Sequence, residues 1–92
     1  MYLEIVSPEA TLFAGEVSSV TVPGINGEFQ MLQNHAPIVS LLQEGDVKVQ
    51  GDIQIAEEFQ NKFSTSANGE TVLAITSGTI EMKDNKVIVL AD

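Results

Sequence analysis

Apolar and polar residues alternate along much of the chain. Near the amino terminus, Leu3 and Ile5 lie among polar neighbours, and a similar spacing recurs in the valines at 17, 20 and 22. A period close to two is typical of strands with one buried face, because successive side chains of a strand point to opposite sides. Three further segments are rich in the Val, Ile and Thr that favour strands: Thr71–Thr76, Thr79–Met82 and Lys86–Leu90.

Turn-forming residues separate these apolar runs at short intervals. Gly, Pro, Asn and Asp supply the positive or fixed φ values that tight turns need. They gather at Ser7–Glu9, Ala14–Gly15, Pro23–Gly27, Glu44–Asp46, Gly51–Asp52, Ala67–Gly69 and Asp84–Asn85. The sequence therefore predicts many short antiparallel strands in an all-β sandwich or flattened barrel.

One segment, Ile55–Phe63, fits two kinds of structure. Its apolar residues Ile55, Phe59 and Phe63 are four apart, a spacing that suits one face of a helix or one face of a strand. We predict a strand, because the neighbouring segments are predicted strands. No repeat, low-complexity tract or linker divides the chain, so we expect one domain over residues 1–92.

The composition limits the classes of protein that the sequence fits. A chain of 92 residues is long enough for one modest core. It has no Cys, which excludes disulfides and thiolate metal sites. The amino terminus lacks a signal-peptide pattern, and the longest apolar runs are too short to span a bilayer. We expect a soluble, intracellular protein with no direct membrane insertion.

The charge balance is strongly acidic. Thirteen Asp and Glu residues against four Lys give a formal net charge of −9. This charge repels phosphate backbones and anionic headgroups, so the sequence does not predict nucleic-acid binding. An acidic surface of this kind is either a solvated face that keeps a small domain dispersed or a complement to a basic protein partner.

Candidate chemistry is sparse. No phosphate-binding loop, dinucleotide fingerprint, nucleophile elbow or zinc-protease motif occurs, and a single His excludes a multi-histidine metal site within one chain. The sequence predicts no catalytic residue, metal or cofactor. Carboxylate pairs at Glu57–Glu58, or at Glu44 with Asp46, are the only acid–base candidates, but adjacent residues of a strand diverge. Two alternatives stay open at this point: a carboxylate enzyme and a stand-alone ligand-binding β-sandwich.

The lone His35 has three possible roles. A catalytic base needs an orienting acid and a substrate pocket, and the sequence around His35 supplies neither. A structural role fits a turn in which Asn34 tolerates a left-handed backbone and Pro37 fixes the exit. The third role is a place on a docking surface.

Short motifs occur in one consistent order along the chain. They are Val6–Glu9, Leu12–Val17, Val20–Gly24, Gly27–Glu28, His35–Pro37, Ser77–Glu81 and Asn85–Asp92. In this order and spacing, the whole chain resembles the amino-terminal domain of the epsilon subunit of F-type ATP synthases. The Gly-Glu and His-Ala-Pro motifs are separated by the interval typical of that family, and the Val-Leu-Ala-Asp ending matches as well.

The resemblance implies a fold and a role. In that family the domain is a flattened antiparallel β-sandwich of about ten short strands, with no catalytic group of its own. As a rotor component of the central stalk, it joins the gamma subunit to the polar loops of the c-ring and so helps couple proton translocation to ATP synthesis. The implied location is peripheral, on the cytoplasmic side of the inner, energy-transducing membrane. Carried over by residue, Glu28 faces the c-ring loops and His35 lies in the neighbouring loop of the docking region.

The sequence also departs from the family pattern. Gln30 and Asn34 stand where relatives usually carry Gly; Asn replaces Gly at positive φ more readily than other residues do, so we expect the turn at Asn34 to form. The segment Gly51–Gly69 is longer than in many relatives. The family typically continues into two helices that act as an inhibitory arm and in some members bind ATP. Here the sequence stops at Asp92, without that helical domain, as a naturally short form or as a truncated chain.

Overall fold

The computed structural model describes residues 1–92 and contains ten strands and one short 3₁₀ helix. This result confirms the predicted all-β sandwich, including the number of strands. The elements in chain order are β1 (Tyr2–Val6), β2 (Thr11–Glu16), β3 (Ser19–Gly24), β4 (Gly27–Met31), β5 (Ile38–Leu42), β6 (Gly45–Gln50), η1 (Glu57–Lys62), β7 (Phe63–Thr65), β8 (Thr71–Ile75), β9 (Gly78–Lys83) and β10 (Lys86–Ala91).

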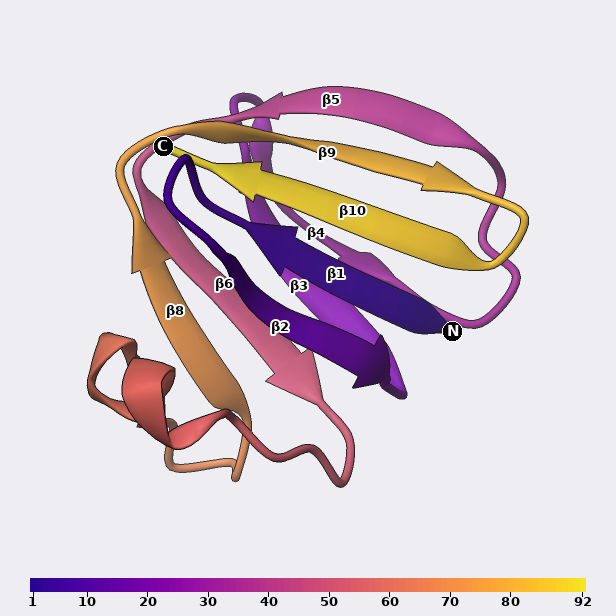
Figure 1. Cartoon of the computed structure of the whole chain (residues 1–92). Helices are drawn as coiled ribbons and strands as arrows, with labels where there is room; N and C mark the ends of the chain where they lie inside the picture. Colours follow the sequence, from indigo (N-terminus) through magenta and orange to yellow (C-terminus); the bar gives the residue numbers. More distant parts are fainter.

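The strands form one sheet that curls into two facing layers (Figure 1). Its strand order is β2-β1-β10-β9-β5-β3-β6-β8-β7, with β4 paired to β3 beside this path. The first four strands of this order form one layer, and β3 with its neighbours forms the other. Strand β5 joins the layers, because it pairs with β9 along its whole length and with β3 only at Gly24 and Leu42.

Every strand pair is antiparallel except β1 with β10, which run parallel from Tyr2 beside Lys86 to Val6 beside Leu90. The antiparallel prediction therefore fails for this one pair. Its two strands come from opposite ends of the chain, and the rest of the domain serves as the long connection that parallel pairing requires. Local sequence patterns hold no information about which distant strands become neighbours.

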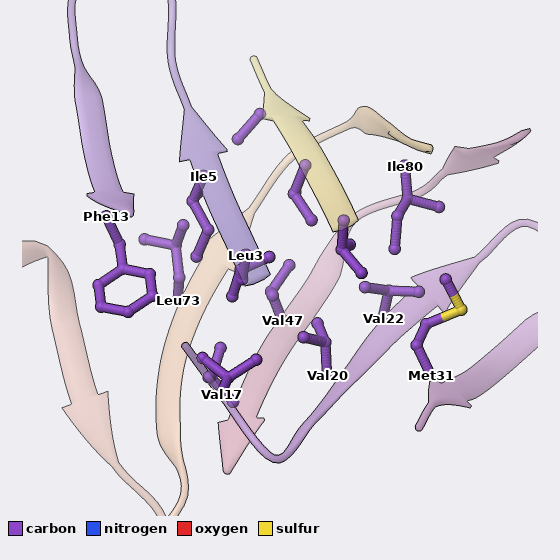
Figure 2. Packing of buried hydrophobic residues seen from close by; sticks show 14 of the residues in the cluster. Leu3, Ile5, Phe13, Val17, Val20, Val22, Met31, Val47, Leu73 and Ile80 are labelled. Atoms are coloured by element: carbon purple, nitrogen blue, oxygen red, sulfur yellow. The ribbon is translucent and has the colours of Figure 1, made fainter. Parts of the chain in front are cut away.

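The core lies between the two layers (Figure 2). Leu3 and Ile5 of β1 are fully buried, as the alternating pattern predicts, and they pack with buried residues of β3, β6, β8 and β9. Val17 belongs to the same cluster although it lies in the connection between β2 and β3 rather than in a strand. Burying one such side chain stabilises the fold by roughly 1.5–3 kcal/mol relative to leaving it exposed.

The strand predicted over Ile55–Phe63 is wrong for most of its length. Residues Glu57–Lys62 form η1, and only Phe63 enters a strand, the three-residue β7. The Phe59 N–H donates to the Ala56 carbonyl at 2.9 Å, which closes a helical turn. In this arrangement Ile55, Phe59 and Phe63 all pack against the core cluster. Ile55 lies before η1, Phe59 lies within it and Phe63 begins β7, so the four-residue spacing does not mark one face of a single element.

The helical content is confined to η1, six residues long. No helix of the structure has the length and apolar character needed to cross a membrane.

Candidate docking site

Glu28 lies at the start of β4, directly after the turn that joins β3 to β4. Gly27 adopts a positive φ of 122° there, a conformation that side-chain-bearing residues rarely adopt. The Glu28 side chain is 53% exposed, and its Oε2 lies 3.1 Å from Nζ of Lys48 on β6. The pair reaches across β3, which lies between β4 and β6. The Glu28 carboxylate is therefore exposed, as the sequence predicts, but it already forms an ion pair with Lys48.

Negative charge dominates the surroundings of Lys48. The hydrogen bond to Glu28 and the charge of that carboxylate raise the pKa of Lys48 above its ordinary value, and the charges of Glu70 and Asp46 add to the effect. The Lys48 side chain is 32% exposed, so water screens these interactions in part. Lys48 stays protonated across the physiological pH range, and the pair with Glu28 persists as an ion pair.

His35 lies in the loop Leu32–Pro37 between β4 and β5, called the His35 loop below. Asn34 has a φ of 60°, so the left-handed turn expected at this position forms with Asn in place of Gly. The His35 N–H donates to the Leu32 carbonyl at 3.1 Å. Its Nδ1 lies 2.7 Å from the Ala36 carbonyl oxygen. A carbonyl can only accept, so Nδ1 carries the hydrogen and Nε2 is the ring nitrogen left for another contact.

Glu28 lies at one end of β4, and His35 lies in the loop beyond the other end. The side chains of Phe29 and Met31 point toward the core, whereas Glu28 and Gln30 are exposed on the outer side of the strand. The structure therefore does not bring Glu28 and His35 into contact; they flank one exposed strand face. That face has no strand beyond β4, which pairs only with β3.

A second exposed surface is apolar. Val39 and Leu41 of β5 are 74% and 59% exposed, and Leu90 of β10 is 49% exposed. Leu41 and Leu90 both pair with Thr79 of β9, so they lie in one row across three strands and on the same side of the sheet. We call Val39, Leu41 and Leu90 the outer strip. Large apolar residues gathered on one sheet face commonly mark an interaction surface.

No arrangement suited to catalysis accompanies these surfaces. Glu57 and Glu58 lie together at the start of η1, both exposed, rather than on opposite faces of a strand. Their carboxylates stand where the positive end of the helix favours them. A hollow of ≈ 440 Å³ is lined by Glu9, Lys62 and Asp92 above an apolar floor, with no aromatic side chain. No group of three or more His, Cys, Asp or Glu residues is placed to hold a metal ion.

Three features of these candidate docking surfaces were not predicted from the sequence. The pairing of Glu28 with Lys48 and the contacts of the His35 loop depend on distant strands, so no local sequence pattern predicts them. The outer strip did leave a signal. In Ile38-Val39-Ser40-Leu41-Leu42, apolar residues occupy both faces of a strand, whereas a half-buried strand needs only one apolar face.

Comparisons with known proteins agree with this fold. The family described as the ATP synthase delta/epsilon chain β-sandwich domain matches residues 1–92. The ATP synthase epsilon chain of Chlorobaculum tepidum is 36% identical over 90 residues, which cover 98% of this chain and 86% of that one. The epsilon chain of Campylobacter curvus is 37% identical over all of this chain, which spans only 60% of that relative.

Two solved structures with this fold belong to mitochondrial ATP synthases. In the central stalk and c-ring structure of the Tetrahymena thermophila mitochondrial ATP synthase, one chain superposes with a TM-score of 0.74 at 14% identity, covering 99% of this chain and 62% of that one. A chain of the Euglena gracilis mitochondrial enzyme gives 0.73 at 18% identity, covering 97% and 48%. At such identities the likeness establishes the fold alone, whereas the match of residues 1–92 is a match of sequence. The chain belongs to the family of the ATP synthase delta/epsilon chain β-sandwich domain.

Proposed function

We propose that this chain serves as a non-catalytic central-stalk subunit of an F-type ATP synthase. It joins the gamma subunit to the c-ring and helps couple proton translocation to ATP synthesis. The observation that carries the proposal is the sequence match over residues 1–92, with relatives named ATP synthase epsilon chain at 36% and 37% identity. The protein then works at the periphery of the membrane complex, on the cytoplasmic side of the energy-transducing membrane.

The outer strip is the surface that we assign to the gamma subunit. Val39, Leu41 and Leu90 are exposed on β5 and β10 in the isolated domain, and covering them with an apolar face of gamma removes them from water. Their flat arrangement on paired strands suits a broad, permanent contact better than a small ligand. Glu81 of β9, which pairs with Val39, adds a charge to this face that favours a basic residue on the partner.

The outer side of β4 is the surface that we assign to the c-ring loops. Glu28 at one end of β4 offers a carboxylate, and His35 at the other end offers the free Nε2 of its ring. A basic residue on a ring loop competes with Lys48 for Glu28 or shares the carboxylate with it. Such a contact sets orientation and specificity more than raw affinity.

A rigid domain suits the coupling role. The cluster of buried residues draws side chains from both layers of the sandwich, so displacing one layer against the other disrupts many contacts at once. Torque applied at β4 is therefore carried to the outer strip with little deformation between them. The protein contributes stiffness and contacts, and the chemistry of ATP takes place on other subunits.

Affinity purification from native membranes tests this assignment. A tagged copy of the chain is expected to recover gamma and c subunits, and depletion of the chain is expected to reduce ATP-driven proton pumping more than ATP hydrolysis. Recovery of the tagged chain free of both subunits would reject the central-stalk role. Recovery of gamma without c would reject the ring contact alone.

A further inference from the structure

The His35 loop is tied to the turn between β9 and β10, far away in the sequence. Figure 1 shows the connection from β4 to β5 passing beside that turn. The Asn34 N–H donates to Oδ1 of Asn85 at 2.8 Å, and Nδ2 of Asn85 donates to Oε1 of Gln33 at 3.3 Å. One Asn side chain therefore binds two consecutive residues of the loop, directly before His35. We call these two hydrogen bonds the tie.

Both ends of this tie are fixed in the fold. The Asn85 carbonyl accepts a hydrogen bond from the Tyr2 N–H at 3.1 Å, which joins the β9–β10 turn to β1. Nε2 of Gln33 donates to the Val17 carbonyl at 3.2 Å, and its Oε1 also accepts from the Met1 nitrogen at 2.7 Å. Gln33 and Asn85 thus connect the loop to the β2–β3 corner and to the β9–β10 hairpin at once.

The backbone of both segments makes this contact possible. Asn34 and Asn85 have φ values of 60° and 61°, and Asp84 beside Asn85 has 53°. Asn is the side-chain-bearing residue that adopts this left-handed conformation most readily, because its short amide bonds locally. The amide of Asn85 instead bonds to the His35 loop, so this residue does more than shape its own turn.

We propose that Gln33 and Asn85 are positioning residues that hold the His35 loop against the β9–β10 hairpin. The inference rests on the proposed function, in which the loop meets the c-ring and the sheet of β5, β9 and β10 meets gamma. The tie then gives load on the loop a direct path into the gamma-facing sheet, in addition to the covalent path through β5. Removing the tie leaves His35 present but lets its loop yield under load.

Two glycine variants of the same turn test the tie. Asn85→Gly removes the bonding amide while Gly keeps the left-handed backbone available. Asp84→Gly is the control, because it introduces Gly one residue earlier, where the side chain forms no hydrogen bond or ion pair. In the free chain, hydrogen exchange at the Asn34 amide is expected to rise on the order of tenfold in Asn85→Gly and by less than about twofold in Asp84→Gly.

A variant of Gln33 tests the other side chain of the tie. Gln33→Met keeps the side-chain length and removes the amide. Its effect on Asn34 exchange is expected to be less than additive with that of Asn85→Gly, because both variants break one network. Equal exchange at Asn34 in the two glycine variants overturns the tie. So does full additivity of Gln33→Met with Asn85→Gly.

The role in coupling is measured in the reassembled enzyme. With Asn85→Gly, the subunit is expected to stay bound while the ratio of proton pumping to ATP hydrolysis falls by about half or more, and Asp84→Gly is expected to match the wild type. Faster exchange with an unchanged ratio overturns the positioning role. The proposed function fails separately, if variants of Glu28 and of the outer strip also leave retention and pumping unchanged.

Discussion

Nζ of Lys48 lies 3.1 Å from Oε2 of Glu28, so the carboxylate assigned to the ring contact is paired within its own domain. The two residues come from β6 and β4, with β3 between them. The ion pair with Lys48 limits the rotamers that the half-exposed Glu28 side chain samples. In the proposed contact with the ring, a basic ring residue competes with Lys48 for this carboxylate.

Reversing the charge of Glu28 separates its structural role from its docking role. Glu28→Lys loses an exposed pair and places two cations together, so we expect the melting temperature of the free chain to fall by less than about 5 °C. Retention of the subunit in the assembled enzyme is expected to fall on the order of tenfold, because like charges then face each other at the contact. Thermal melts and quantified retention check these two outcomes.

The double variant Glu28→Lys with Lys48→Glu serves as the control. It restores an ion pair between β4 and β6 with the charges exchanged, so the melting temperature should return toward that of the wild type. Retention should stay low, because the charge at position 28 is still reversed. Restored retention in the double variant would mean that Glu28 acts only through Lys48 and has no contact with the ring.

The pair also gives a pH dependence with a definite sign. The pKa of Lys48 is raised in the folded protein above its ordinary value of 10.5, so folding favours the protonated form. The stabilisation is complete below that ordinary value and is lost as the pH rises through the folded pKa. The difference in melting temperature between wild type and Lys48→Met is therefore expected to stay constant from about pH 6 to pH 9 and to shrink in more alkaline buffer. A difference that grows in alkaline buffer contradicts the pairing.

A substitution in the outer strip is expected to weaken binding to gamma without unfolding the domain. Leu41→Asp places a charge on an exposed position, so the melting temperature of the free chain is expected to change by no more than a few degrees, about the effect of an ordinary surface substitution. Binding to gamma is expected to weaken by at least about tenfold, because a desolvated charge is costly at an apolar contact. Ala74→Asp, at an exposed position on β8, is the control that should bind normally. Equal binding of gamma by both variants would remove the outer strip from the interface.

His35 is expected to contribute to docking more weakly than Glu28. His35→Ala removes the hydrogen bond from Nδ1 to the Ala36 carbonyl and the free Nε2, but it deletes no charge pair. We expect a melting temperature close to that of the wild type and a smaller drop in subunit retention than with Glu28→Lys. His35→Gln, which keeps a polar side chain, should recover part of the retention. A drop larger than that of Glu28→Lys would reverse the assigned importance of the two residues.

Substitutions at buried positions are expected to lower the free energy of unfolding more than substitutions on these surfaces. Ile80 of β9 is fully buried, whereas its neighbour in register, Ser40 of β5, lies nearer the surface. Ile80→Ala is expected to cost about 2–5 kcal/mol in the free energy of unfolding, because it leaves a cavity between the layers. Leu41→Ala, at an exposed site, should cost about 0.5 kcal/mol or less. Denaturant titrations of the two variants test where the core lies.

Much of the fold follows from local sequence. Alternation at Leu3 and Ile5 predicts β1, and the Val-rich last third predicts β8, β9 and β10. The turn at Asp84–Asn85 forms with both residues at positive φ, as its residue types indicate. These features were accessible because strand period and turn chemistry depend on residues that are neighbours in the chain.

The tertiary structure alone decided the remaining features. The local spacing at Phe59 fits both a helix and a strand, and only the folded chain shows this residue in η1 and packed against the core. The parallel pairing of β1 with β10, the Lys48–Glu28 pair and the contact of Asn34 with Asn85 join positions far apart in the sequence. Such contacts form when the whole chain finds the packing that buries its apolar faces together. Since that packing is a property of all strands at once, no short stretch of sequence determines which distant polar residues it brings within hydrogen-bonding distance.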